Sequence, residues 1–188
     1  MFVQEWYLVP MYLLLLQEMA FFWLVAHSIQ GFSDRETVAL LGAHNIGKIG
    51  CEFIDSRLNN FTGTGQPDPA LPPDFLNEMR LKCQDNTRNA DASPLAPRVR
   101  MSSSISSGAV FDSHYYQNLL RVRGILFSDQ QLMANKRTAR VVAAYASDDG
   151  SAFRMDFARA MTKMSGLSVL TGSQGQVRLD CSLPVNSY

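Results

Sequence analysis

The sequence lacks an excess of charge of either sign. Lysine and arginine together number 17, and so do aspartate and glutamate, so the formal net charge is zero. Proteins that bind nucleic acid usually carry a clear basic excess, so we predict no nucleic-acid partner. The sequence also lacks an internal repeat of about 20–50 residues, which excludes a solenoid. Its 188 residues, 46% of them hydrophobic, suffice for one domain, or most of one, with a sizeable core.

Cysteines are few, and their spacing excludes a zinc knuckle. Cys51, Cys83 and Cys181 are far apart, without the Cys-x-x-Cys pair or clustered histidines of such sites. An odd number leaves one thiol over: either all three are reduced in an intracellular protein, or a fourth cysteine has been lost. The triplet Asn-Phe-Thr that begins at Asn60 matches an N-glycosylation acceptor. Beside the cysteines, it favours a secretory compartment.

Residues 1–30 differ from the rest of the chain. From Trp6 to Ala26 the segment is mostly apolar, and it is long enough for a membrane span, which needs about 20 such residues. However, Glu18 lies near its middle, where a charge costs roughly 2.5–3.5 kcal/mol on insertion scales. An orthodox signal peptide begins with basic residues, whereas the early charge here is Glu5. We interpret residues 1–30 as a buried or adventitious apolar segment, with a membrane span or signal anchor as the alternative.

The remaining residues predict an all-α body with long loops. Ser33 and Glu36 have the spacing of a capping box, so a short helix should follow with Val38 and Leu41 inward. Gly42 should end that helix, which places His44 at or just past its C-terminus. Further helices are predicted over about 73–82, from Asp112 or Ser113 to about 122, over about 136–147, and over about 151–165 with Phe153, Phe157, Met161 and Met164 on one stripe. Residues 55–72 are rich in turn formers and 84–110 predict a long loop, and no alternating pattern predicts strands.

Several separate motifs follow one another along the chain. They are ALLGAHNIGK (39–48), Cys51, Arg57-Leu58, NFT (60–62), PDP (67–69), Cys83, FDSHYY (111–116), GILFSDQ (124–130), LTGSQGQVR (170–178) and Cys181. From Gly31 to about Asn186, these motifs in this order resemble the proximal part of the classical secretory plant (class III) haem peroxidases. The set is specific, whereas a lone Gly-Ala-His would be a weak indication.

The cofactor that the resemblance implies is haem b. In that family the motif histidine, here His44, is the axial iron ligand, and the aspartate of the Ser-Asp-Gln motif, here Asp129, accepts its other ring N–H. The chemistry suits both residues, because a neutral imidazole binds iron through one nitrogen. A carboxylate on the other nitrogen makes the ring more basic and stabilises oxidised iron. The implied fold is the proximal, C-terminal half of an all-α haem-peroxidase domain over residues 31–188, and residues 1–30 have no counterpart in it.

The resemblance also implies a disulfide. Cys51 and Cys83 match a pair that is joined in the family, and closing a loop of that size stabilises by roughly 3–4 kcal/mol. Cys181 matches a cysteine whose family partner lies in the N-terminal half, so we predict it to be unpaired.

A calcium site is the least secure implication. The corresponding residues are Asn45, Ser104, Ser107, Val110 and Asp112. Serine stands at 104, where the family has a carboxylate. Ca²⁺ takes six to eight oxygen ligands and gains affinity from their charge, so we expect binding there to be weak.

Two other histidines need an interpretation. His114 falls at a variable place in its motif, which predicts a solvent-facing helix residue. His27 could be mistaken for a distal catalytic histidine, but the family's distal arginine and Phe-His-Asp-Cys motif do not surround it.

The function implied by the resemblance is peroxidase activity. Such enzymes use H₂O₂ to oxidise small phenolic donors one electron at a time, in hydrogen peroxide catabolism and the response to oxidative stress. They are secreted or vacuolar, and we expect a monomer. The distal arginine and histidine, which supply acid–base and electrostatic help, are not in this sequence. Our alternative hypothesis is therefore a catalytically inactive fragment, membrane-associated through residues 1–30, in which that segment replaces a lost N-terminal half.

Overall fold

The computed structural model describes residues 31–88, 97–102 and 111–175. Its helices are α3 (Asp34–Leu41), α4 (Asp55–Asn59), α5 (Pro73–Arg88), α6 (His114–Leu120), α7 (Phe127–Gln131), α8 (Lys136–Ser147) and α9 (Ser151–Ser165), and its strands are β1 (Lys48–Gly50) and β2 (Arg98–Arg100). Short 3-10 turns occupy Gly42–Asn45, Cys51–Phe53, Phe61–Gly63 and Gly172–Gln174. The predicted all-α class is confirmed, with one short ribbon of strands added.

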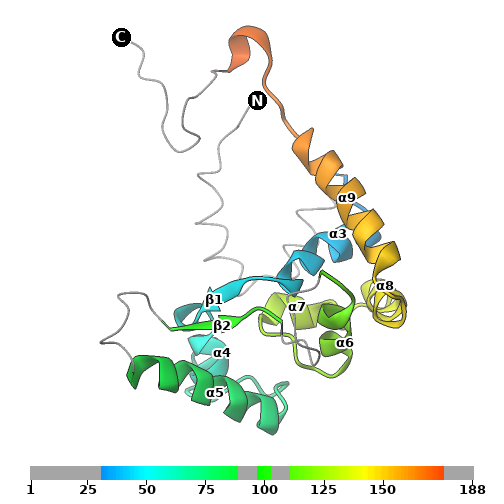
Figure 1. The fold of residues 1–188 in the computed structure, drawn as a ribbon. Helices are drawn as coiled ribbons and strands as arrows, with labels where there is room; N and C mark the ends of the chain where they lie inside the picture. The colour runs from blue at the N-terminus through cyan, green and yellow to red at the C-terminus, as the bar shows by residue number, and fades with distance from the viewer. Residues whose placement is uncertain (1–30, 89–96, 103–110, 176–188) are drawn as a thin grey trace, which may run out of the picture.

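The helices form two groups that the segment after α3 connects (Figure 1). In the larger group, α3 packs against α8 and α9, and α6 packs against α8. The buried side chains of its core are Val38, Ala39, Leu41, Tyr115, Tyr116, Leu119, Leu132, Val142, Tyr145 and Phe153. In the smaller group, α4, α5 and the strands enclose Cys51, Ile54, Leu58, Leu71, Phe75, Met79, Val99 and Ile125. The turn that carries His44 leaves α3 and leads into β1, so it joins one core to the other.

Helix α3 begins at the predicted capping box. The Ser33 hydroxyl accepts from the Glu36 backbone N–H at 3.2 Å, and the Ser33 N–H donates to the Glu36 carboxylate at 2.7 Å. Five consecutive residues, 37–41, are buried, because α8 and α9 cover the helix from two sides. The prediction for Val38 and Leu41 is confirmed, and the buried helix fixes where the His44 turn starts.

Helices α8 and α9 have the bounds that the sequence predicts. Asn135 caps α8 by accepting from the Arg137 N–H at 2.8 Å. Along α9, Phe153 is fully buried, but Met161 is 43% exposed, so the predicted stripe is wrong at that position. Ala160, two turns after Phe153, occupies the inner face instead, in a small cluster with Phe32 and Leu40.

One helix, α5, and the two short strands depart from the sequence predictions. Helix α5 continues to Arg88, and β2 lies within the range 84–110 that predicted a loop. The strands β1 and β2 pair antiparallel with Ile49 opposite Val99. Each has only three residues, too few for an alternating pattern to indicate a strand.

Within the described ranges, no helix is long and apolar enough to span a membrane. The interpretations of residues 1–30 and of His27 lie outside the described residues.

A buried arginine links the smaller core to the segment before α7. Arg57 of α4 donates through Nε to Asp68 Oδ2 at 2.8 Å. Its Nη1 donates to the backbone carbonyls of Gly124 and Ile125 at 2.6 and 2.7 Å. Arg57 and Asp68 are both nearly inaccessible to solvent. The pair therefore holds in place the chain that leads into α7, the helix of Asp129.

We predict that Asp68→Asn destabilises the fold by about 3–5 kcal/mol, because it leaves the Arg57 charge buried without its counter-ion. Urea unfolding followed by circular dichroism measures the change. The control is Arg137→Gln, which breaks an exposed pair with Asp34 and should cost less than about 1 kcal/mol. Equal losses in the two variants would contradict this role for Asp68.

Candidate functional site

The candidate site is centred on a hydrogen bond between His44 and Asp129. His44 lies in the 3-10 turn directly after α3, and Asp129 lies in α7. Their Nδ1 and Oδ1 atoms are 2.8 Å apart. The carboxylate accepts, so Nδ1 carries the proton and donates. Nε2 makes no hydrogen bond within the described part of the chain, and the imidazole is 29% exposed. Two residues that are 85 positions apart in sequence are thus brought together.

Asp129 is fully buried, and three donors hold its carboxylate. Oδ1 accepts from His44 and from the Tyr115 hydroxyl, the latter at 3.0 Å. Oδ2 accepts from the Leu126 backbone N–H at 3.2 Å, at the first turn of α7. A buried carboxylate is stable when it is hydrogen-bonded and paired in this way. The three bonds also fix the direction in which Asp129 meets the imidazole.

The turn of His44 lies close against the larger core because Gly42 has no side chain. A Cβ atom at residue 42 would come within 2.3 Å of the Phe153 ring and of the Tyr116 hydroxyl. A larger residue would therefore push the turn away from the core, and His44 with it.

The electrostatics of the site favour a hydrogen-bonded, basic imidazole. Burial lowers the pKa of His44, but the charge and hydrogen bond of Asp129 outweigh burial, and the pKa is raised above its usual value of 6.5. For Tyr115, burial and the nearby Asp129 charge raise the pKa well above 10.0. Tyr115 consequently stays a neutral phenol that can donate to Asp129.

This arrangement fits an axial ligand for haem iron. The ring nitrogen that faces Asp129 is committed as a donor, which leaves Nε2 available to a metal. The carboxylate raises the basicity of the ligand and orients its ring. Nε2 of His44 is the atom that would hold the iron.

A second cluster surrounds Asp112, just before α6. The Asn45 amide donates to the Asp112 backbone carbonyl, and the His114 ring Nδ1 contacts Asp112 Oδ1. The His114 backbone N–H also donates to that Oδ1, at 2.9 Å. Burial would raise the pKa of Asp112, but these hydrogen bonds from His114 outweigh it and lower the pKa. His114 is buried, so the prediction of a solvent-facing residue is wrong: its ring folds back onto Asp112 instead of pointing outward.

The described residues provide only part of the predicted calcium site. Asn45 Oδ1 is buried and has no hydrogen-bond partner there, which suits a cation ligand. However, no group of three His, Cys, Asp or Glu side chains that could hold a metal occurs in the described ranges. Ser104, Ser107 and Val110 lie outside them.

The other implied residues lie away from His44. Cys51 and Cys83 form a disulfide with a Cα–Cα distance of 5.8 Å, which joins the turn after β1 to α5. Cys181 lies outside the described residues. Asn60 is exposed, and its Oδ1 accepts from the Gly65 N–H at 2.7 Å, so the side chain is oriented on the surface.

Comparisons with known proteins decide the family. A family model described as "Peroxidase" matches residues 25–148. The chain belongs to the peroxidase family. "Putative Peroxidase 48" of Arabidopsis thaliana is 40% identical to this chain, over 85% of the chain and 46% of the relative. Peroxidase 37 of the same plant is 41% identical over 81% of the chain and 42% of the relative. Peroxidase N1 of Nicotiana tabacum is 39% identical over 81% and 45%.

The relatives are plant peroxidases, which confirms the predicted resemblance to class III enzymes. The chain spans less than half the length of the curated relatives it matches. The family match begins at residue 25, within the segment 1–30 that we predicted to lie outside the domain. The boundary at Gly31 stays a prediction.

One residue of the site, Tyr115, is not predicted by the sequence. Its hydroxyl bonds Asp129 across 14 positions and two helices. The residue lies in the FDSHYY motif, but nothing in the spacing distinguishes a tyrosine that only packs from one that holds a carboxylate. The burial of Tyr115, with 2% of the residue exposed, is visible only in the fold.

We predict that Asp129→Asn lowers the pKa of His44 in the haem-free chain, because the variant removes the charge that opposes burial. A pH titration of the imidazole signals by NMR measures the pKa of His44. The control is Asp149→Asn, on the exposed loop before α9, which should leave the titration unchanged. An unchanged His44 midpoint in Asp129→Asn would disprove the coupling.

The His44–Asp129 pair also makes the free energy of unfolding depend on pH. The contribution of the pair to stability is fully present below pH 6.5 and is lost as pH rises through the raised pKa of His44.

Proposed function

We propose that this chain provides the proximal side of a haem b pocket in a peroxidase that uses H₂O₂ to oxidise phenolic donors one electron at a time. The observation that carries the proposal is the His44 imidazole, which donates from Nδ1 to a fully buried carboxylate and keeps Nε2 available. Membership of the peroxidase family supports the choice of haem as the group that His44 binds.

Each residue of the site has a separate task in this proposal. His44 binds the iron through Nε2. Asp129 holds the opposite N–H and strengthens the ligand, which favours the oxidised iron that peroxidases need. Tyr115 donates to Asp129 and so keeps that carboxylate in line with the imidazole. When bound, haem supplies the redox chemistry.

Cleavage of peroxide also needs proton transfer and a cation on the opposite side of the haem, help of a kind that typically contributes 10²–10⁴-fold. The family's distal arginine and Phe-His-Asp-Cys motif do not occur in this sequence. We therefore propose that the chain oxidises donors as a peroxidase does. The alternative is that it binds haem without catalysing this reaction. We further propose secretion, a monomeric state and a glycan on the exposed Asn60.

We predict that haemin added to the purified chain gives a Soret band that His44→Ala abolishes. Asp129→Ala should weaken haem affinity about 10–100-fold, as loss of a residue that supports a ligand does. Titration followed by absorbance measures both. His114→Ala, at the other histidine of the described residues, is the control and should keep the band.

The same samples test activity with H₂O₂ and a phenol. Oxidation well above that of free haemin supports a catalytic chain, whereas a His44-dependent Soret band without such oxidation supports the inactive alternative. A Soret band that is identical in His44→Ala would disprove the ligand assignment.

We also propose a weak Ca²⁺ site at Asn45 and Asp112, supported by the buried Asn45 Oδ1, for which no described residue provides a donor. We predict that Ca²⁺ at about ten times its Kd stabilises the chain by roughly 1.4 kcal/mol. Thermal unfolding with Ca²⁺ or with a chelator measures the effect. Asp112→Asn should remove the response, and Asp149→Asn should keep it. A melting temperature that is insensitive to Ca²⁺ would reject the site.

A further inference from the structure

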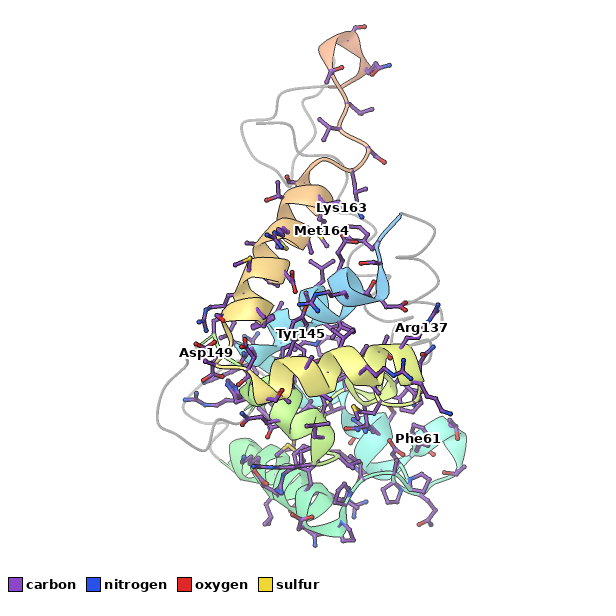
Figure 2. The ribbon with its side chains drawn as sticks, turned by 90° about the vertical axis from the view of Figure 1, so that its right-hand side faces the viewer. Phe61, Arg137, Tyr145, Asp149, Lys163 and Met164 are labelled. Atoms are coloured by element: carbon purple, nitrogen blue, oxygen red, sulfur yellow. A yellow bond between two sulfur atoms is a disulfide. The ribbon has the colours of Figure 1, made fainter. Side chains whose placement is uncertain are left out.

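Three tyrosines form a series of ring contacts that begins at His44 and runs through the larger core to the buried Tyr145. The ring centroids of His44 and Tyr115 are 6.3 Å apart, and the rings meet edge to face. Tyr115 and Tyr116 follow at 5.0 Å, and Tyr116 and Tyr145 at 4.9 Å. Figure 2 shows Tyr145 on α8, where this helix approaches α3 and α9. The result is a continuous series of oxidisable rings that begins at the proposed iron ligand.

The hydroxyls of the three tyrosines have different acceptors. Tyr115 donates to Asp129, and Tyr116 donates to the Val38 backbone carbonyl at 3.1 Å. Tyr145 donates to Asp156 Oδ2 at 2.8 Å. A phenol that loses an electron becomes a strong acid, so a stable radical needs a base at its hydroxyl. A backbone carbonyl is too weakly basic for this task, which excludes Tyr116 as the place where an oxidised ring comes to rest.

The carboxylates that accept from Tyr115 and Tyr145, Asp129 and Asp156, also differ in their exposure to solvent. Asp129 has no exposure to solvent, and its ionised form is needed to hold His44. Asp156 is 15% exposed, and its partner Arg35 is 52% exposed. A proton that reaches Asp156 can therefore exchange with water, and solvent screens the Arg35 charge that is left behind. Of the three positions, Tyr145 is the one where loss of an electron and loss of a proton can both be accommodated.

The surroundings of Tyr145 also favour loss of its phenolic proton together with its electron. Burial and the hydrogen bond to Asp156 raise its pKa, so the resting side chain is a neutral phenol. Arg35 lies over the ring, 5.2 Å from its centroid. The cation disfavours a positively charged ring, so oxidation of Tyr145 has to be coupled to proton transfer.

We propose that Tyr115, Tyr116 and Tyr145 form a relay that carries one-electron oxidising equivalents from the haem side of His44 to Tyr145, next to the surface pair Asp156–Arg35. The relay rests on the proposed function, since it needs haem held by His44 and H₂O₂ as the oxidant. With haem bound at His44, H₂O₂ would take up two electrons from the haem-loaded site and two protons from solvent, and would leave as two molecules of water. Tyr145 returns one of these electrons through Tyr116 and Tyr115 and gives its phenolic proton to Asp156. A soluble one-electron donor then reduces Tyr145, and the proton returns to the phenol.

Packing alone does not require these hydroxyls. Phe153 contacts both Tyr116 and Tyr145 in the same core, with ring centroids 5.1 and 6.0 Å away, and it needs no polar partner. Phenylalanine would fill each tyrosine position with almost the same volume. Tyr→Phe variants consequently separate the relay from the packing.

The test is freeze-quench EPR of the haem-loaded full chain after one equivalent of H₂O₂. We expect a tyrosyl radical signal in the wild type, and we expect its loss in Tyr145→Phe and in Tyr116→Phe. Tyr188→Phe removes a tyrosine outside the relay and is the matched control, which should keep the signal. The Soret band of every Tyr→Phe variant should match that of the wild type, because His44 is unchanged.

Asp156→Asn tests the proton acceptor, with Asp149→Asn as its control. The asparagine keeps an oxygen near the Tyr145 hydroxyl but removes the base, so the radical signal should be lost in Asp156→Asn and kept in Asp149→Asn. Circular dichroism shows whether each variant is folded.

The outcomes separate the relay from the proposed function. If the Soret band does not depend on His44, the proposed function and the relay both fail. If His44 holds the haem and H₂O₂ shifts the Soret band, but no tyrosyl radical appears or a radical of equal size appears in Tyr145→Phe, the relay alone is overturned. If H₂O₂ leaves the Soret band unchanged, the catalytic part of the proposed function fails and the relay fails with it.

Discussion

The hydrogen bond between His44 Nδ1 and Asp129 Oδ1 is the constraint on which the rest of the site depends. The Asp129 carboxylate in this bond has no access to water. Burying such a charge costs free energy unless hydrogen-bond donors surround it. The Tyr115 hydroxyl and the Leu126 backbone N–H complete that set of donors. The orientation of the His44 imidazole therefore depends on the partners of Asp129 as much as on His44, which is itself partly exposed.

The two cores meet at this hydrogen bond. His44 follows α3 of the larger core, whereas the chain before Asp129 is held by Arg57 of the smaller one, through the carbonyls of Gly124 and Ile125. The disulfide fixes that smaller core by joining the turn after β1 to α5. A change in the smaller core can consequently shift Asp129 without touching His44, so stability and the geometry of the His44–Asp129 hydrogen bond are coupled in this fold.

The sequence predicted those parts of the fold that are long or capped. Helices α3 and α8 have side-chain caps, α9 has apolar periodicity of its own, and the bounds of all three followed from local residues. The ribbon, α4 and α7 are three to five residues long and depend on tertiary contacts, so no periodic pattern marks them. His44 and Asp129 were paired only through motifs of a known family. The bond of Tyr115 to Asp129, and the ring of His114 folded onto Asp112, could not be seen before the helices were placed.

The two ends of the tyrosine series have the same construction but opposite exposure. At one end a phenol donates to Asp129, which also pairs with His44; at the other a phenol donates to Asp156, which also pairs with Arg35. The buried carboxylate cannot exchange protons with water and is suited to fixing a ligand. The partly exposed one can exchange protons and is suited to accepting them. The difference in solvent access, rather than in residue type, gives two equivalent Tyr–Asp pairs different chemistry within one core.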